Sequence, residues 1–386
     1  MEHSERKGYL GAVCGESRTY GSESEVPRII PGIDRNQTIN LNRTLAYSKK
    51  GGVNWYDYNS IKECVESEIQ ILEQIQPDLV LVSFRPTANT ACELLQIPLA
   101  TILNALWTNY SAVKIRAPEH HPITKILGRP VASLIAPWAK EIVFTLDSLP
   151  FQKFRRDRGL PPRRNIWDVW RGDLNLIADI PEYSPTKNLP SNFHYIGPIT
   201  WQADLKMPSW FETLDPQRKT LYITMGSTGN SSLFEQIMEI FEDTEYQCIM
   251  TTAGRANLLN VPKNFLVAEY APGDKIMKVS DLVICQGNHG TVYQALTEGV
   301  PIIGIAGSSE QDFNVDRVTD LGIGIRLSGL KFQPSHLLQA VEKIFTDSSY
   351  LENARKFSQK VSKYNAPQKG AQIIDNYLSS PQEQTL

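Results

Sequence analysis

The sequence predicts an α/β protein of two domains, each built on a parallel β-sheet wrapped by helices. From residue 219 onward, short apolar runs alternate with amphipathic segments, as strands and helices do in such sheets. The same alternation occurs less regularly over residues 61–104. The chain has 386 residues, which suits two domains at about 100 to 200 residues per domain.

The first half begins its pattern with an amphipathic helix that ends at Pro77. Its apolar stripe comprises Ile61, Cys64, Val65, Ile69, Leu72 and Ile75. A strand at 78–84, a helix at 87–97 and a strand at 98–104 then form one βαβ unit. Residues 116–173 hold many prolines and long helical pieces, and two more strands are expected at 174–179 and 193–199.

The second half follows a regular order of strands and helices. Strands are expected at 220–225, 246–253, 265–270, 281–286, 301–306 and 323–327, and helices at 231–241, 290–299, 309–322 and 334–345. The last helix carries its apolar face on Leu337, Leu338, Val341, Ile344 and Phe345.

The predicted domain division follows from these patterns. Residues 1–200 form the N-terminal domain and 219–364 the C-terminal domain. Residues 201–218 contain Trp and Pro without a clear period and are expected to link the two. Residues 365–386 are expected to form a C-terminal helix or tail.

Composition narrows the class of protein. A formal charge of −3 gives no overall attraction to nucleic acid, so nucleic acid is not an expected partner. The five cysteines are scattered without C-x-x-C spacing, which argues against a disulfide framework or a zinc site and favours a reducing, cytoplasmic location. The sequence shows neither the apolar core of a signal peptide nor a membrane-spanning run.

The heptapeptide Cys285–Thr291 is the first candidate binding loop. It follows a buried strand directly and starts a helix. Gly287 and Gly290 let the backbone come close to a ligand, and the free N–H groups of the helix start favour an anion such as a diphosphate. The alternative is a tight turn whose glycines only allow the helix and strand to pack closely.

Two other junctions between a strand and a helix have a similar character. Gly226, Ser227 and Thr228 follow the first strand of this half with small side chains and hydroxyls. Glu310 and Gln311 follow the strand at 301–306, and an acid beside an amide suits the recognition of sugar hydroxyls. The alternative for Glu310 is an acidic first turn that complements the helix dipole.

The stretch "EYAPGDKIMKVSDLVICQGNHGTVYQALTEGVPIIGIAGSSEQDFNVDRV" resembles the nucleotide-binding signature of the UDP-glycosyltransferase superfamily. "YITMGST" and "YIGPI" support the resemblance. It implies the GT-B fold, in which two Rossmann-like domains face each other across a cleft.

The resemblance also implies roles for particular residues. Tyr270 falls where the family contacts the base, and Gln294 where it binds ribose hydroxyls. Glu310 and Gln311 match the pair that holds the donor sugar. The loops at the diphosphate comprise Gln286, Gly287, Asn288, Gly290 and Thr291, with Gly226, Ser227 and Thr228 closing over the phosphates.

The chain departs from the family pattern at several positions. The family usually has His at Gln286, a second Gly at Asn288 and Glu at Gln294. Gln286 can donate a hydrogen bond to phosphate but carries no positive charge. His289 lies at a variable position of the pattern and is expected to be a surface or packing residue.

The catalytic base is unknown from the sequence. The family opens with a strand and a loop that bears a catalytic His, and residues 9–36 lack this pattern, so the N-terminal domain is expected to be truncated at its start. Ser83, Phe84 and Arg85 stand where the Asp partner of that His would lie. His120 and His121 either line an acceptor cleft or belong to an ordinary loop.

A basic run at 153–164 follows the apolar segment 131–144. It either contacts an anionic membrane that carries a lipid acceptor or forms a solvated helix and loop.

The sequence therefore predicts a glycosyltransferase that moves a sugar from a nucleotide-diphosphate sugar, with UDP the expected nucleotide, to a hydroxyl of a small-molecule or lipid acceptor. No Asp-x-Asp motif occurs in the second half, so neither a metal nor a cofactor is expected. Two alternatives stay open: a non-catalytic nucleotide-sugar-binding protein or inactive relative, and a sugar-nucleotide epimerase.

Overall fold

The computed structural model describes residues 57–379 apart from 84, 201–204, 227–230 and 257. These residues form two compact units. Unit 1 comprises residues 57–113, Trp138–Ile196 and 367–379, and unit 2 comprises Lys114–Pro137 and Gly197–Ala366. Within the described part of the chain, no helix has both the length and the apolar character needed to cross a membrane.

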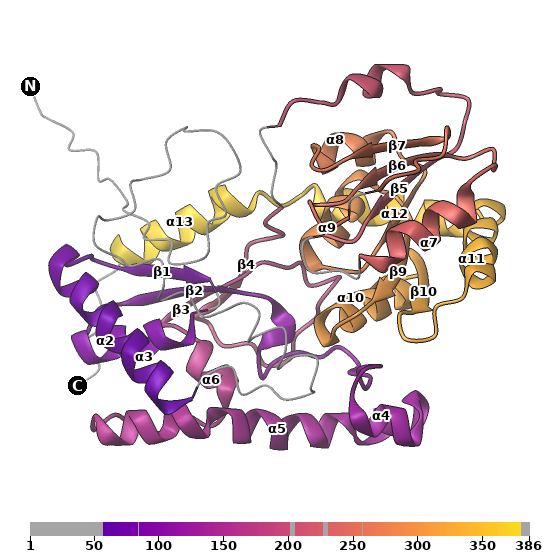
Figure 1. Ribbon diagram of the computed structural model, residues 1–386. Coiled ribbons are helices and arrows are strands. Elements are labelled where there is room, and N and C mark those ends of the chain that lie inside the picture. The colour runs from indigo at the N-terminus through magenta and orange to yellow at the C-terminus, as the bar shows by residue number, and fades with distance from the viewer. Residues whose placement is uncertain (1–56, 84, 201–204, 227–230, 257, 380–386) are drawn as a thin grey trace, which may run out of the picture. The chain divides into compact units, whose positions relative to one another are not determined.

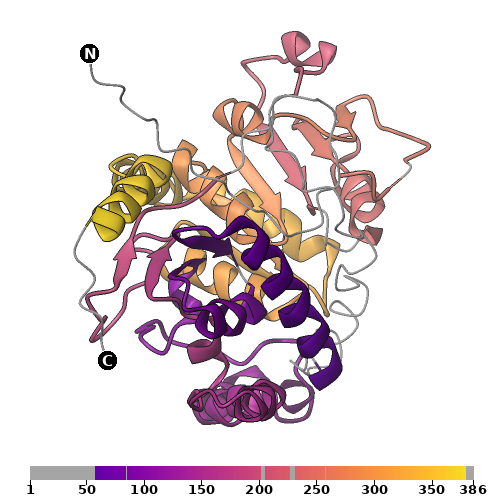
Figure 2. The same cartoon turned by 90° about the vertical axis from the view of Figure 1, so that its left-hand side faces the viewer.

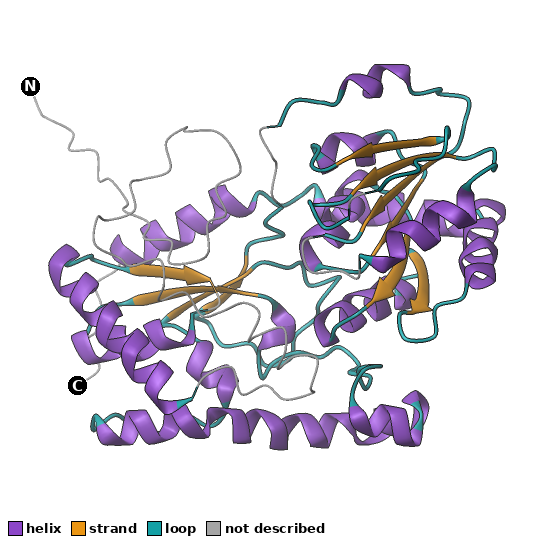
Figure 3. Cartoon of the chain, viewed as in Figure 1, coloured by secondary structure: helices purple, strands orange, loops and turns teal. Residues whose placement is uncertain are grey.

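Unit 1 is built on a sheet of four parallel strands in the order β1-β2-β3-β4 (Figure 1). The strands are β1 (Val80–Ser83), β2 (Leu99–Leu103), β3 (Leu174–Ile177) and β4 (Phe193–Tyr195). Figure 3 shows α13 (Ala366–Ser379) on one face of this sheet. The other face carries α2 (Tyr58–Ile75), α3 (Pro86–Leu95) and α6 (Ile166–Trp170).

The predicted amphipathic helix of the first half is α2. It begins after Asp57, whose carboxylate accepts a hydrogen bond from the Ser60 amide at 2.9 Å, a typical N-cap. Ile61, Val65 and Leu72 from its predicted stripe are buried against α3 and α6. Three tryptophans complete this core at ring-centroid distances of 5.0–5.6 Å: Trp107 of the 3-10 helix η2 (Ala105–Trp107), Trp167 and Trp170.

A single helix of 29 residues, α5 (Arg129–Asp157), occupies much of the region that the sequence pattern left unclear. Figure 2 views this helix, drawn in magenta, close to its axis. Its inner side buries Asp147, Phe151 and Phe154, and the guanidinium of buried Arg155 binds Glu93 at 2.9 Å. Because Arg155 is paired, its burial does not leave an isolated charge in the core.

Unit 2 contains six parallel strands in the order β10-β9-β8-β5-β6-β7, with helices packed around them. The strands are β5 (Thr220–Thr224), β6 (Gln247–Thr251), β7 (Phe265–Ala268), β8 (Leu282–Cys285), β9 (Ile302–Ala306) and β10 (Gly324–Ser328). The helices are α4 (Pro122–Leu127), η3 (Ser209–Thr213), α7 (Ser232–Phe241), α8 (Gly273–Lys278), α9 (His289–Glu298), α10 (Ser309–Asp320), α11 (Pro334–Thr346) and α12 (Ser349–Val361). When β5 to β10 are numbered one to six in chain order, the sheet reads 3-2-1-4-5-6 from β7 to β10. This is the doubly wound strand order of a dinucleotide-binding fold.

Lys114–Pro137 joins unit 2 through ion pairs with α10. Arg116 binds Asp320 at 2.6 Å, and Arg129 binds Asp316 at 2.5 Å. The amide of Glu119 donates to Asp312 at 2.8 Å. The three aspartates follow one another at intervals of four residues, so they lie on one face of α10.

The compact units differ from the predicted residue division at two places. Lys114–Pro137 belongs to unit 2 because of the ion pairs with α10, although it lies inside the predicted 1–200. The predicted C-terminal helix is observed as α13, and residues 367–379 are part of unit 1. A Cβ at Gly370 of α13 would lie 3.8 Å from Ile196 and 3.9 Å from Leu176, so this helix packs on the unit 1 core.

The predicted strands and helices match the observed ones within a few residues, with small exceptions. The predicted buried face of α11 holds for Leu337, Val341 and Ile344 but not for Leu338, which is exposed. The short helix α8 and the helix α12 were not predicted.

Asp147 yields a prediction about pH and stability. Its Oδ2 is buried without a hydrogen-bond partner among the described residues, and burial raises the pKa of this carboxyl to about 7 from its usual value of 3.8. Between these pH values the folded state binds a proton that the unfolded state lacks, so this group makes the free energy of unfolding fall as pH rises. We expect Asp147→Asn to remove this slope and to stabilise the protein at pH 8 by about 1 kcal/mol.

Chemical denaturation at a series of pH values measures this effect. Glu141→Gln changes an exposed carboxyl of the same helix and serves as the control, which should keep the slope. If Asp147→Asn kept the slope of the unchanged protein, the carboxyl would not be held protonated in the folded state.

Candidate functional site

The candidate site lies in unit 2, where the order of the strands reverses. The chain runs from β5 through β6 to β7 on one side, and from β8 through β9 to β10 on the other. Since all these strands are parallel, the loops after β5 and β8 leave the same edge of the sheet and diverge there. A Cβ at Gly226 would lie 2.9 Å from Gln286 Nε2 and 3.1 Å from Asn288 Nδ2, so the two predicted loops are in contact.

The two glycines of the loop after β8 have different surroundings. Gly287 has a φ of +90°, and a Cβ there would overlap the Val315 side chain of α10. Its carbonyl accepts a hydrogen bond from Asn314 Nδ2 at 3.0 Å. Gly287 therefore allows the loop after β8 to pack closely against α10. This is the alternative role that the sequence left open for it. Gly290, in contrast, has no atom of the described residues within 4 Å of the place of a Cβ, so this place is open in the described part of the chain.

The start of α9 faces this open space. Asn288 is the N-cap residue, but its side chain does not cap the helix. Its Oδ1 instead accepts a hydrogen bond from Gln311 Nε2 at 2.8 Å. The first-turn amides at Gly290 and Thr291 are therefore not covered by an N-cap side chain, which is the arrangement that suits an anion at a helix N-terminus.

Gln311 connects two loops of the site. It is buried, and its Oε1 accepts a hydrogen bond from the Gly307 amide at 2.8 Å while its Nε2 binds Asn288. Both ends of the amide are thus used to hold the loop after β9 against the loop after β8. Glu310 lies half-buried beside it in the first turn of α10.

Tyr270 and Gln294 lie along the same unit. The hydroxyl of Tyr270 donates to the Ala253 carbonyl at 2.9 Å, which places the ring beside the loop that follows β6. Gln294, on α9, has its Oε1 3.5 Å from the place of a Cβ at Gly273, which begins α8. The structure thus brings three of the predicted donor-binding residues, Gln286, Asn288 and Gln311, close together. Gln294 lies further along α9.

Other residues singled out in the sequence lie outside the described part of the chain or make local contacts. Ser227, Thr228 and Phe84 lie outside the described residues. The ring of His289 lies 4.7 Å from that of Tyr293, a packing contact within α9. His121 caps α4 by accepting from the Ile123 amide at 3.3 Å, and His120 Nδ1 lies 3.9 Å from Asp312 Oδ2.

The position where the family resemblance would put an Asp carries an ion pair instead. Arg85 Nε donates to Glu68 Oε1 at 2.6 Å, and the Thr87 hydroxyl donates to the same oxygen at 2.7 Å. Burial raises the pKa of Glu68, although Arg85 and both hydrogen bonds act to lower it. Arg85 is thus committed to holding the start of α3 against α2.

Sequence reasoning missed a cluster of charges behind Glu310 and Gln311. Arg326 of β10 binds Asp312, and it also binds Glu119 at 3.2 Å. Burial alone would raise the pKa of Asp312, but the hydrogen bond of His120 and the charge of Arg326 together hold it below its usual value. The spacing of Asp312, Asp316 and Asp320 was the signal in the sequence that could have indicated a partner for α10.

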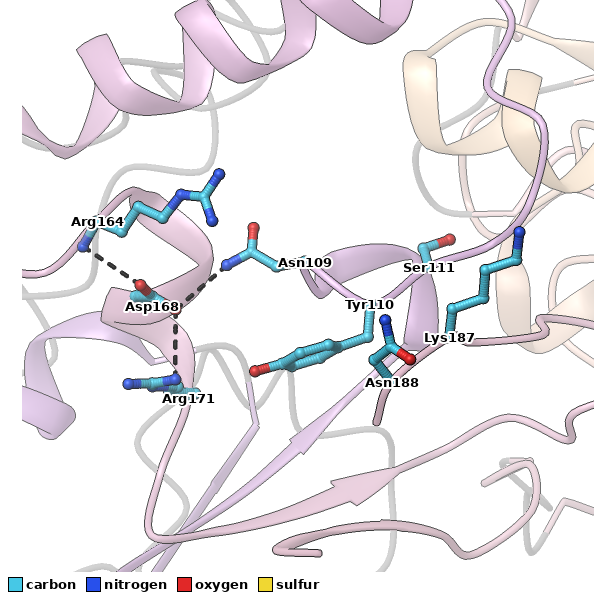
Figure 4. A pocket seen from close by; sticks show the side chains of 8 residues that line it. All are labelled: Asn109, Tyr110, Ser111, Arg164, Asp168, Arg171, Lys187 and Asn188. Carbon is cyan, nitrogen blue, oxygen red and sulfur yellow. Dashed lines mark hydrogen bonds and ion pairs between the residues drawn. The ribbon is translucent and has the colours of Figure 1, made fainter. Parts of the chain in front are cut away.

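Unit 1 contains a pocket of about 540 Å³, shown in Figure 4. It lies beside the loops that follow β2 and β3, hence at the carboxyl edge of the unit 1 sheet. Asp168 forms one wall, where Asn109 Nδ2 donates to it at 3.2 Å and Arg171 lies 3.6 Å away. Arg164 and Lys187 add two more cations, so the pocket has an excess of positive charge.

The fold and the comparisons with known proteins agree. The family described as "Erythromycin biosynthesis protein CIII-like, C-terminal domain" matches residues 233–376. A solved structure of the spinosyn rhamnosyltransferase SpnG complexed with thymidine diphosphate has a TM-score of 0.61 at 16% identity, covering 86% of this chain and 80% of that one. The predicted GT-B fold of glycosyltransferases is thereby confirmed.

Two curated relatives extend this likeness to the sequence. The PGL/p-HBAD biosynthesis glycosyltransferase of Mycobacterium tuberculosis is 32% identical over 309 residues, which are 79% of this chain and 72% of the relative. The PGL/p-HBAD biosynthesis rhamnosyltransferase of Mycobacterium bovis is 32% identical over 308 residues, with 79% and 68% covered. The chain belongs to the UDP-glycosyltransferase superfamily and is a glycosyltransferase by this relationship.

The contrast between the two glycines is open to a direct test. Gly287→Ala should lower the free energy of unfolding by at least about 1 kcal/mol, because its φ is positive and its Cβ would overlap Val315. Gly290→Ala is the matched control and should change it by less than about 0.5 kcal/mol, since its Cβ enters open space. Thermal unfolding measures both variants. Equal effects would contradict the packing role assigned to Gly287.

Proposed function

We propose that the protein transfers a sugar from a nucleotide-diphosphate sugar, with UDP as the nucleotide, to a hydroxyl of a small-molecule or lipid acceptor. The observation that carries the proposal is the meeting of the loops after β5, β8 and β9 at the switch point of the unit 2 sheet, with the uncapped start of α9 beside them. Switch points of this kind bind nucleotides in doubly wound folds.

The diphosphate of the donor would lie against the start of α9. Backbone amides at Gly290 and Thr291, together with the positive end of the helix dipole, would neutralise the charge that develops on the leaving group. Gln286 is buried beside this place and can donate from its amide without adding charge. This arrangement needs no metal or further cofactor in the proposed reaction.

Two residues at the start of α10 would have separate roles toward the donor sugar. Glu310 has a carboxylate at the first turn that can accept hydrogen bonds from sugar hydroxyls. The amide of Gln311 already holds Gly307 and Asn288, so its first role is to fix the two loops. Tyr270 and Gln294 are the proposed contacts for the base and the ribose, and Ser227 and Thr228 keep their proposed place over the phosphates.

In the reaction, the bond between the sugar C1 and the diphosphate oxygen breaks while the acceptor oxygen bonds to C1. The acceptor hydroxyl proton passes to a base that we do not assign.

We place the acceptor side in unit 1, supported by the pocket at the carboxyl edge of its sheet. A cytoplasmic location is supported by the unbridged thiols of Cys92, Cys248 and Cys285 in the described part of the chain.

A non-catalytic, donor-binding protein is the second candidate function. The ion pair between Arg85 and Glu68 favours it, because this pair occupies the position at which the family resemblance would put the Asp partner of the base. Both candidates share the donor site, so only turnover separates them.

Donor binding can be tested at Gly290. Gly290→Glu places a negative charge in the open space at the start of α9, and we expect it to weaken UDP binding by about tenfold or more, since the loss of one charge-assisted bond has this effect. Titration calorimetry with UDP measures the affinity, with Gly290→Ala as the control of equal backbone change. If the Glu and Ala variants bound UDP equally well, the diphosphate would lie elsewhere.

Turnover can be tested with a panel of hydroxyl acceptors. We expect release of free UDP from a UDP-sugar to depend on an acceptor and to persist with a chelator present, because helix amides rather than a metal would stabilise the leaving group. The Gly290→Glu variant serves as the control with weakened donor binding and should release less UDP at low donor concentration. Donor binding without release on every acceptor would favour the non-catalytic function, and loss of release with chelator would contradict the metal-free mechanism.

A further inference from the structure

The outer side of α5 carries a row of large apolar side chains that lie in solvent. Trp138, Ile142, Leu146 and Leu149 are 78%, 62%, 54% and 53% exposed. They follow one another at separations of four, four and three residues, so they lie on one face of the helix. We call this row the apolar face. Leu134 and Ile135, also exposed, precede it on the same helix.

Among the described residues, the apolar face takes no part in the core of unit 1. The inner side of the same helix already supplies the core contacts, through Phe151, Phe154 and the stem of Arg155. A helix that is apolar on both sides is usually covered on both sides. Large exposed apolar patches mark interaction surfaces, whereas single exposed apolar residues are ordinary.

The row of the apolar face continues into positive charge. Lys153 and Arg156 follow Leu149 at separations of four and three residues, and both are exposed. Two exposed acids border the row: Glu141, which lies 4.0 Å from Arg164, and Asp157, which follows Arg156. Asp157 accepts a hydrogen bond from the Tyr58 hydroxyl at 2.6 Å. The row thus presents apolar side chains first and then cations.

We infer that the apolar face docks on the surface of an anionic lipid bilayer. In this arrangement, α5 lies in the plane of the bilayer surface, with its apolar side chains at the boundary of head groups and acyl chains. Trp138 suits that boundary because its ring is apolar with one polar N–H. Lys153 and Arg156 would meet anionic head groups.

A second copy of the chain is a poorer match for this face. The sequence from Pro122 to Lys140 contains no Asp or Glu, and its basic residues are Lys125, Lys140 and Arg129, the last of which pairs with Asp316. An antiparallel pair of α5 helices would therefore bring Lys153 and Arg156 near basic residues, and a parallel pair would bring them near their own copies. Both arrangements put like charges together, whereas an anionic bilayer complements the whole row.

The inference does not depend on the proposed donor chemistry. If it holds, it favours a lipid among the acceptors that the proposed function leaves open, because docking on a bilayer would hold the enzyme where lipid hydroxyls are available.

Vesicle flotation with the full chain tests the inference. We expect binding to vesicles of phosphatidylcholine with phosphatidylglycerol, and little binding to phosphatidylcholine alone. Ile142→Glu should abolish the binding, because it puts a charge in the centre of the apolar face. Leu259→Glu is the matched control and should bind like the unchanged protein, since Leu259 is 85% exposed but is not part of α5.

A second variant keeps the test sharp if Ile142→Glu folds poorly. The double variant Lys153→Gln, Arg156→Gln leaves the apolar face intact and should weaken binding to the anionic vesicles by about tenfold or more, since each basic side chain contributes near such a surface. UDP affinity should be unchanged in all variants, which separates failure of docking from failure of the donor site.

The inference is overturned if the unchanged protein fails to bind the anionic vesicles, or if Leu259→Glu reduces binding as much as Ile142→Glu. It is also overturned if light scattering shows a dimer that Ile142→Glu separates while vesicle binding is absent, because the face would then be covered by a second copy.

Discussion

The close approach of α10 to the ends of β8 and β9 governs the candidate site. Val315 of α10 fills a space that exists only because Gly287 and Gly304 have no side chains, since a Cβ at either glycine would overlap it. This contact sets the distance of α10 from the sheet. It therefore also sets where Glu310, Gln311 and Asn314 stand relative to the loop after β8.

The charges on α10 reinforce the same placement from the other side. Asp312, Asp316 and Asp320 are held by arginines from β10 and from Lys114–Pro137, so the helix is fixed by ion pairs on one face and by Val315 on another. A buried ion pair contributes more to a defined geometry than to stability when its desolvation is considered. Here it aligns the residues proposed to contact the donor sugar.

Much of unit 2 could be predicted because its strands are short, fully buried and separated by turns, so that each apolar run in the sequence corresponds to one strand. The helix α8 was missed because six residues are too few to show a period, and α12 because only Ala354, Phe357 and Val361 are buried in a charged segment. Leu338 was assigned to the wrong face because a helical stripe in the sequence does not show where the buried arc ends.

The sequence indicated which loops form the site, but it did not indicate which residues of these loops contact one another. The sequence indicated that both Gly287 and Gly290 matter, but only the position of Val315 separates a packing glycine from one that faces open space. The two amide bonds of Gln311 likewise depend on residues brought together by the sheet order. The pairing of Arg116 with Asp320 spans 204 residues, which no local pattern conveys.

The chain passes between its two compact units at four points, after Val113, Pro137, Ile196 and Ala366. Neither unit is therefore a continuous stretch of sequence. A fragment cut near residue 200 would take Asp316, Asp320 and Arg326 without Arg129, Arg116 and Glu119, and would carry a helix, α13, whose packing surface had been left behind. Each half thus holds a segment that packs with the other half of the sequence, so the compact units do not coincide with any single cut of the chain.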